Sequence, residues 1–172
     1  MDISIIGKNT IKIKGKSATF IVDPAREMPK TSADAIALLD GVGNVDLSRI
    51  TDSRMIISGP GGYEVGGAKI SGTSTPKGIL YRFSIDAVSV ILGKTTESKV
   101  DGFDECQVAV INTDDEFSES SITGLEPKIT ILYGDKKAEA AKALGVENAI
   151  PVSKITITKD KLPEKMEVVT LG

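Results

Sequence analysis

The chain contains no histidine and no tryptophan among its 172 residues, and it has a single cysteine. Histidine is the commonest metal ligand in proteins and the side chain whose charge changes near neutral pH, so chemistry that depends on it is excluded. One cysteine excludes an intrachain disulfide, and Cys106 lacks the histidine that usually activates a nucleophilic thiol. We therefore expect Cys106 to be a small buried hydrophobic residue in a reducing, cytoplasmic protein.

Other absences limit the classes of partner. No apolar run reaches the ~20 residues that a membrane-spanning helix needs, and residues 1–10 lack the features of a signal peptide. Lysine and arginine number 21 against 24 acidic residues, which gives a net charge of −3. The densest basic group spans residues 8–16, where alternation along a strand places Lys12, Lys14 and Lys16 on one solvated face. We therefore expect neither a nucleic acid nor a membrane as partner.

Glycine and proline are frequent instead, with 17 and 7 residues, and short β-branched runs lie between them. Such runs bounded by turn residues are typical of β-strands. In the first half of the chain they predict strands at 2–6, 9–14, 17–23, 54–58, 68–73, 78–84 and 87–93. The apolar run 33–39, "ADAIALL", is expected to be a further, buried strand, because buried strands show continuous apolar sequence.

The second half of the chain alternates strands with helices. Strands are predicted at 107–112, 128–134 and 149–152, followed by a final pair at 154–160 and 166–171. Helices are predicted at 135–145, with Gly145 as the C-terminal cap, and at 117–125. A β-meander followed by alternating strands and helices predicts a layered α/β sandwich. At this length, residues 1–172 are expected to form one domain.

The blocks from "FIVDP" to "LEPKITILYG", taken in order, resemble the metallo-β-lactamase fold. They are most similar to its short Zn-dependent hydrolase-like branch, which is related to ascorbate-phosphate lactonases. The most specific piece is "SGPGGYEVGG" at 58–67, close to that branch's Gly-Pro-Gly-Glu-Tyr-Glu-Val-x-Gly pattern, with Gly62 replacing the first glutamate. The resemblance implies a four-layer αββα sandwich of reduced size.

The resemblance also places the family's metal site on this chain. The His-x-His-x-Asp-His motif falls on residues 41–46, "GVGNVD", and the Gly-His pair of the first strand falls on Gly7 and Lys8. The aspartate that bridges two metals is matched by Lys94, and the closing motif by residues 132–135. The degenerate site implied in this way comprises Lys8, Asp40, Gly41, Gly43, Asp46, Lys94, Gly134 and Asp135.

This set of residues does not suit zinc. Zinc is held by imidazole nitrogens and carboxylates, and it acts by lowering the pKa of bound water to about 7. Glycine has no side-chain donor, and Lys94 brings a positive charge to the position of a dication. Only Asp46 keeps an oxygen donor, so we expect no zinc and no other cofactor. We expect Lys94 to replace the metal charge by contacting Asp46, either directly or through one water.

Three alternative kinds of site are also compatible with the sequence. Asp40, Asp46, Asp135 and the acidic run 114–116 would form an oxygen site for Mg²⁺ or Ca²⁺ if they converged, although solvated loop acids are the simpler interpretation. Tyr63 and Glu64 would line a pocket with Lys94 as a metal-free acid–base site. The loop 58–67 would bind phosphate, but it lacks the Lys-Ser/Thr ending of a P-loop, and a turn that leads into strand 68–73 explains it better.

The sequence therefore favours a non-catalytic protein with a metallo-β-lactamase fold and a binding or assembly role, with a protein or a small molecule that the sequence does not name as partner. The alternative is a hydrolase or lactonase that acts through a metal-free site or an oxygen-ligand site for Mg²⁺, Ca²⁺ or Mn²⁺. Because the edge strands are β-branched and the net charge is small, we also expect a homodimer.

Overall fold

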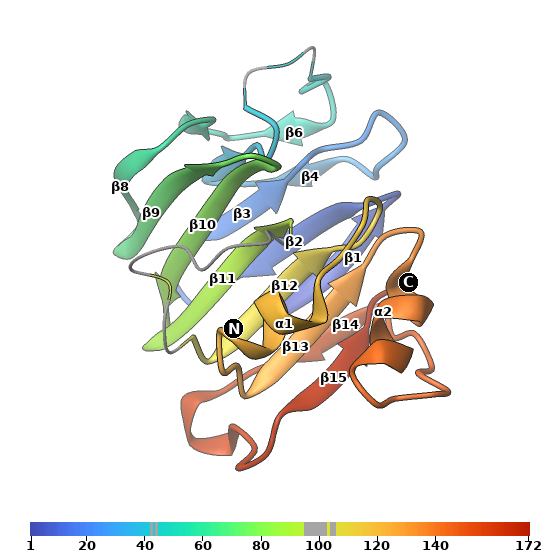
Figure 1. Ribbon diagram of the computed structural model, residues 1–172. Helices are drawn as coiled ribbons and strands as arrows, with labels where there is room; N and C mark the ends of the chain where they lie inside the picture. Colours follow the sequence, from blue (N-terminus) through green and yellow to red (C-terminus); the bar gives the residue numbers. More distant parts are fainter. Residues whose placement is uncertain (42, 44, 95–102, 104–105) are drawn as a thin grey trace.

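The computed structural model describes residues 1–41, 43, 45–94, 103 and 106–172. Two β-sheets pack face to face, and two short helices lie on the outer side of one of them (Figure 1). In spatial order, the six-stranded sheet consists of β14 (Lys154–Thr156), β1 (Asp2–Gly7), β2 (Thr10–Lys14), β3 (Thr19–Val22), β5 (Ala35–Ala37) and β7 (Met55–Ile57).

The seven-stranded sheet runs, in spatial order, through β15 (Glu167–Thr170), β13 (Ile129–Tyr133), β12 (Val108–Asn112), β11 (Val88–Lys94), β10 (Gly78–Ile85), β9 (Ala68–Thr75) and β8 (Gly61–Val65). The remaining elements are the parallel pair β4 (Thr31–Ser32) and β6 (Ile50–Thr51), the helices α1 (Glu119–Thr123) and α2 (Lys137–Ala143), and a 3₁₀ turn at Lys159–Lys161. No helix in the described part of the chain has both the length and the apolar character to cross a membrane.

The core lies between the two sheets. Strand alternation explains its composition, because inward residues such as Ile11 and Ile13 of β2 are fully buried while Lys14 is exposed. Phe20 of β3 meets Phe83 of β10 edge to face, with ring centroids 5.3 Å apart. The core therefore contains side chains from both sheets, packed directly against each other.

The helices cover only one outer face among the described residues. Ile122 of α1 and Ala140 of α2 pack on the seven-stranded sheet. The helices cover the outer face of the seven-stranded sheet and the other sheet covers its inner face, so all five residues of β12 are buried. The outer face of the six-stranded sheet is covered in part by a small cluster around Met28 and Ala33. The expected α/β sandwich of reduced size is confirmed.

Several predictions for individual elements are confirmed. The apolar run 33–39 contains β5 and no helix, and α2 lies within the helix expected at 135–145. Cys106 is buried and 2% exposed, and burial raises the pKa of its thiol to about 12. A nucleophilic role for Cys106 is thus disfavoured at neutral pH.

Other predictions are wrong. Residues 58–67 were expected to be only a turn, but Gly61–Val65 forms β8, which pairs antiparallel with β9. Residues 149–152 contribute a single bridge, between Val152 and Leu171, instead of a strand. The two final strands, predicted on either side of a turn, are present as β14 and β15, and they join β1 and β13 in different sheets. A neighbouring strand decided the outcome for β8, which forms a hairpin with β9, whereas residue Val152 has its partner 19 residues away.

Candidate functional site

A cavity of about 820 Å³ opens where several parallel strands end. β3 runs parallel to β5, and β11 parallel to β12, so the loops that follow these strands meet at one edge of the sandwich. The cavity is lined by Asn9, Asp23, Pro24, Arg26, Leu38, Asp40, Gly41, Gly43, Val45, Asp46, Lys94, Asn112 and Asp114. Its location fits the general rule that sites in α/β proteins form beyond the carboxyl ends of strands.

Half of the predicted site positions line this cavity. They are Asp40, Gly41, Gly43, Asp46 and Lys94. Its described lining does not include Lys8, Tyr63, Glu64, Gly134 or Asp135. Val42 and Asn44, which belong to the same loop, lie outside the described residues. The described residues Gly41, Gly43, Val45 and Asp46 of this loop therefore border a cavity.

Tyr63 and Glu64 lie on β8, at the edge of the seven-stranded sheet and three strands away from β11. Adjacent strands are about 4.8 Å apart, so these residues are remote from Lys94. The Tyr63 hydroxyl donates a hydrogen bond to the Gly59 carbonyl oxygen at 3.0 Å. The structure does not bring these three residues together as an acid–base site.

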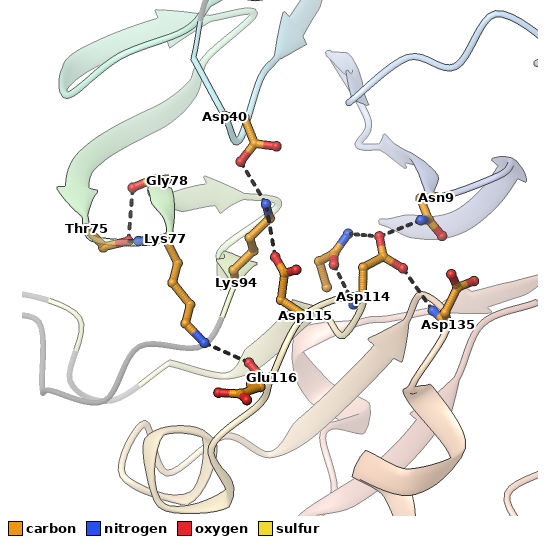
Figure 2. Close-up of polar contacts among 11 residues, drawn as sticks. Asn9, Asp40, Thr75, Lys77, Gly78, Lys94, Asp114, Asp115, Glu116 and Asp135 are labelled. Carbon is orange, nitrogen blue, oxygen red and sulfur yellow. Dashed lines mark hydrogen bonds and ion pairs between the residues drawn. The ribbon is translucent and has the colours of Figure 1, made fainter.

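Lys94, at the end of β11, forms an ion pair with two carboxylates. Its Nζ donates to Asp40 Oδ1 at 2.8 Å and lies 3.5 Å from Asp115 Oδ2 (Figure 2). Burial by itself would lower the pKa of Lys94, but the hydrogen bond to Asp40 and the charges of Asp40 and Asp115 outweigh it and raise the pKa. Lys94 is therefore a fixed cation and unsuited to act as a base near neutral pH.

A direct ion pair between Lys94 and Asp46 is absent among the described residues, so the expected direct contact is wrong. Asp46 Oδ2 lies 3.8 Å from Arg26 Nε, and Asp46 Oδ1 accepts the Ser48 N–H at 2.9 Å. Asp40 lies three residues after the end of β5, whereas Asp46 lies six residues further along the loop. The position nearer to the strand end meets Lys94, because the strand end is the part of the segment that the sheet fixes in place.

Asp114 joins three loops at the side of the cavity (Figure 2). Its Oδ2 accepts hydrogen bonds from Asn9 Nδ2 at 2.6 Å and Asn112 Nδ2 at 3.2 Å. Its Oδ1 accepts the Asp135 N–H at 2.9 Å. These donors are uncharged amides, so they position the carboxylate without neutralising it.

Asp23 is the site residue that the sequence did not identify. Its Oδ1 accepts the Leu39 N–H at 2.9 Å, which ties the end of β3 to the loop after β5. Burial raises the pKa of Asp23 to about 6; the Leu39 hydrogen bond and Lys94 oppose this rise, and the charge of Asp40 supports it. Its only sequence signal is an acid directly after the apolar run "FIV".

The cavity does not suit zinc. Gly41 and Gly43 offer no side-chain donor, and Lys94 occupies the end of β11 with its positive charge directed to Asp40. Among the described residues, no three side chains of the His, Cys, Asp or Glu types are grouped as metal ligands. Asp40, Asp46 and Asp114 do line the same cavity, but their contacts are with Lys94, Arg26 and amides.

No protein-family model matches the chain, and no curated protein matches it by sequence. Among solved structures, it is similar to a Thermotoga maritima protein assigned as a Zn-dependent hydrolase of the metallo-β-lactamase superfamily. That match has 20% identity and a TM-score of 0.77 over 99% of this chain and 97% of the other.

Two further structures are similar. An isothiocyanate hydrolase from Delia radicum gut bacteria matches with 11% identity and a TM-score of 0.65, over 92% of this chain and 99% of that protein. The metallo-β-lactamase fold protein YhfI from Bacillus subtilis matches with 10% identity and a TM-score of 0.61, over 98% and 95% of the two chains. These matches extend over nearly the whole chain.

Proposed function

Since this chain has the metallo-β-lactamase fold, we propose that it is a non-catalytic, zinc-independent member of that fold with a binding role at the cavity. One observation carries the proposal: the ammonium of Lys94 lies between Asp40 and Asp115 at the end of β11. The protein thus supplies a positive charge from its own side chain. We further propose a cytoplasmic location, which suits a buried free thiol.

The chemistry of the lining supports this proposal. Hydrolysis by a metal requires donors that hold the ion and an open coordination position for water. Here the loop positions 41 and 43 are glycines, and the carboxylate of Asp40 is engaged by Lys94. Lys94 remains protonated, so it does not replace the metal as a generator of hydroxide. What remains is a polar cavity of a size that accommodates a small ligand.

Adding excess Zn²⁺ should change the melting temperature by less than about 1 °C, because a ligand that does not bind the folded state cannot stabilise it. Differential scanning fluorimetry with and without Zn²⁺ measures this effect, and EDTA provides the control. Metal analysis of protein purified without chelator completes the test. Stoichiometric zinc, or a rise of several degrees that EDTA reverses, would refute the proposed function.

We also propose that the protein forms a homodimer through β7. The other edges of the two large sheets each carry a charged residue, namely Lys154 in β14, Glu167 in β15 and Glu64 in β8. The edge strand β7 carries none: Met55 is 38% exposed and Ile56 is 48% exposed. Because charges on edge strands prevent association, an uncharged apolar edge supports pairing with the same strand of a second copy.

Replacing Ile56 with lysine should convert the dimer to a monomer, because it places a charge on the apolar edge. Ile150 is 84% exposed and lies outside the named strands, so Ile150→Lys is the matched control and should remain dimeric. Light scattering coupled to size exclusion gives the mass of each variant. A monomer mass for the unmodified protein at high concentration would contradict the proposal.

A further inference from the structure

The stretch 51–56, which leads from β6 into β7, is exposed at every residue. Four large hydrophobic side chains are exposed in the described part of the chain, and two of them, Met55 and Ile56, belong to this stretch. Neighbouring exposed apolar side chains mark surfaces that proteins use for contact, whereas single ones carry no such meaning. The stretch 51–56 is therefore a candidate interaction surface.

A groove of about 540 Å³ runs beside this stretch. Ile57 belongs to the core between the sheets, so alternation along β7 places Ile56 on the outer face of the six-stranded sheet. Ile36, which pairs with Ile56 in the adjacent strand β5, is fully buried and also lines the groove. Leu47 and Ile50 add apolar lining from the segment before β7. The groove can therefore receive an apolar side chain.

Two opposite charges lie at the same groove. Asp52 and Arg54 both line it and both are exposed. Among the described residues, neither takes part in an ion pair. The Asp52 carboxylate accepts a hydrogen bond from the Thr51 hydroxyl at 3.0 Å, which is a neutral donor. The surface thus presents one positive and one negative charge that are available to a partner.

The backbone of β7 is also accessible on one side, because β7 is the last strand of its sheet. The Leu38 N–H donates to the Ile57 carbonyl oxygen at 2.9 Å, so the backbone of Ile57 faces β5. Successive residues of a strand direct their N–H and C=O groups to opposite sides, so those of Ile56 face the free side. Ile56 therefore combines an exposed apolar side chain with backbone groups at a sheet edge.

We propose that a second copy of the chain covers this surface around a twofold axis close to Ser53. Asp52 of each copy then pairs with Arg54 of the other copy, and Ile56 of each copy enters the other copy's groove beside Ile50. This inference rests on the dimer proposed above and names its contacts. A twofold interface must be self-complementary, so that residue i meets residue j and j meets i.

The sequence around Ser53 meets this requirement. Asp52 and Arg54 lie one residue on either side of it, and Ile50 and Ile56 lie three residues on either side. The axis therefore brings opposite charges together and apolar side chains together. It also places the start of β7 beside the start of β7 in the other copy.

Other occupants fit this surface less well than a second copy. The charges of Asp52 and Arg54 cancel, so a strongly charged partner such as a nucleic acid gains no net attraction. An apolar peptide would cover both charges without pairing either, and unpaired buried charges are costly. A second copy supplies a partner for each charge.

Charge reversal tests the inference. Arg54→Glu gives a surface with two acids, and Asp52→Lys gives a surface with two bases. For each variant alone, the dissociation constant of the dimer should rise by at least about tenfold, because like charges then oppose each other across the axis. An equimolar mixture of the two should form a heterodimer, since both opposite-charge contacts return. Native mass spectrometry distinguishes the three species by mass.

Lys161→Glu is the matched control. Lys161 is exposed in the 3₁₀ turn Lys159–Lys161 and does not line the groove, so this variant should remain a dimer. Formation of the heterodimer also excludes a folding defect as the cause of dissociation. Single variants that stay dimeric, or a mixture of folded variants that stays monomeric, would overturn the inference. If Asp52→Lys does not fold, because residue 52 has φ of +65°, a dimeric Arg54→Glu still overturns it.

This inference and the earlier proposals fail in different ways. If Ile56→Lys breaks the dimer while both charge-reversed variants remain dimeric, the contacts named here fall and pairing through β7 stands. If the unmodified protein is a monomer, the inference falls together with the proposed dimer. Zinc independence is decided separately, by the effect of Zn²⁺ on the melting temperature.

Discussion

Replacing Asp23 with asparagine should stabilise the protein at about pH 8 and change its stability little at about pH 4. The folded-state pKa of Asp23 is about 6, above the 3.8 of an ordinary aspartate. Between these values the folded state binds the proton more tightly, so its stability falls as the pH rises through this window. Above pH 6 the full cost of a buried carboxylate is present. A pKa shift of this size corresponds to roughly 1–3 kcal/mol of lost folding stability. The uncharged side chain of asparagine does not carry this cost.

Asparagine is suited to this position for two reasons. Its amide oxygen can still accept the Leu39 N–H, and it tolerates the left-handed backbone of residue 23, where φ is +44°. Asp52→Asn is the matched control, because Asp52 also has a positive φ (+65°) but is exposed. Urea unfolding at the two pH values measures the effect. Equal changes at both pH values, or a loss of stability at pH 8, would show that Asp23 is not a costly buried carboxylate.

Replacing Gly134 with alanine should destabilise the protein by roughly 2–4 kcal/mol. The residue has φ of +107°, a conformation that side chains rarely adopt. An added Cβ would lie 2.7 Å from Asp114 Oδ1 and 3.0 Å from the Asp114 backbone nitrogen. The backbone atom cannot move aside as a flexible side chain would, so the loop that carries Asp114 must shift.

The variant Gly145→Ala separates backbone strain from steric contact as causes of the lost stability. Gly145 also has a positive φ (+88°), but an added Cβ meets no heavy atom within 4 Å. Its replacement should therefore cost about 1 kcal/mol, from backbone strain alone. Thermal or urea unfolding of the two variants side by side gives the difference, which reports the contact with Asp114. If the two costs were equal, the packing of Gly134 against Asp114 would have no part in stability.

The sequence by itself determined most of the strands and both helices, and it determined which side chains stand at the predicted metal-ligand positions. The apolar run 33–39 predicted the buried β5, and the alanine-rich spacing at 135–145 predicted α2, because a strand or helix imposes its own period on burial. The absence of histidine and the presence of glycines and Lys94 at the ligand positions are facts of composition, independent of geometry. The position of the loop 41–46 beside a cavity also followed from the resemblance.

The tertiary structure alone decided the partners within the site. Lys94 meets Asp40 and Asp115 instead of Asp46, and neither partner is near it in the sequence. Asp23 is one acid among many in the sequence, and its pKa rises because β3, β5 and the cavity loops bury it together. Hydrophobic periodicity is a property of one segment, whereas ion pairs and desolvation depend on distances between segments. Those distances are set when the two sheets pack, which is why the sequence could place the site but not assign its contacts.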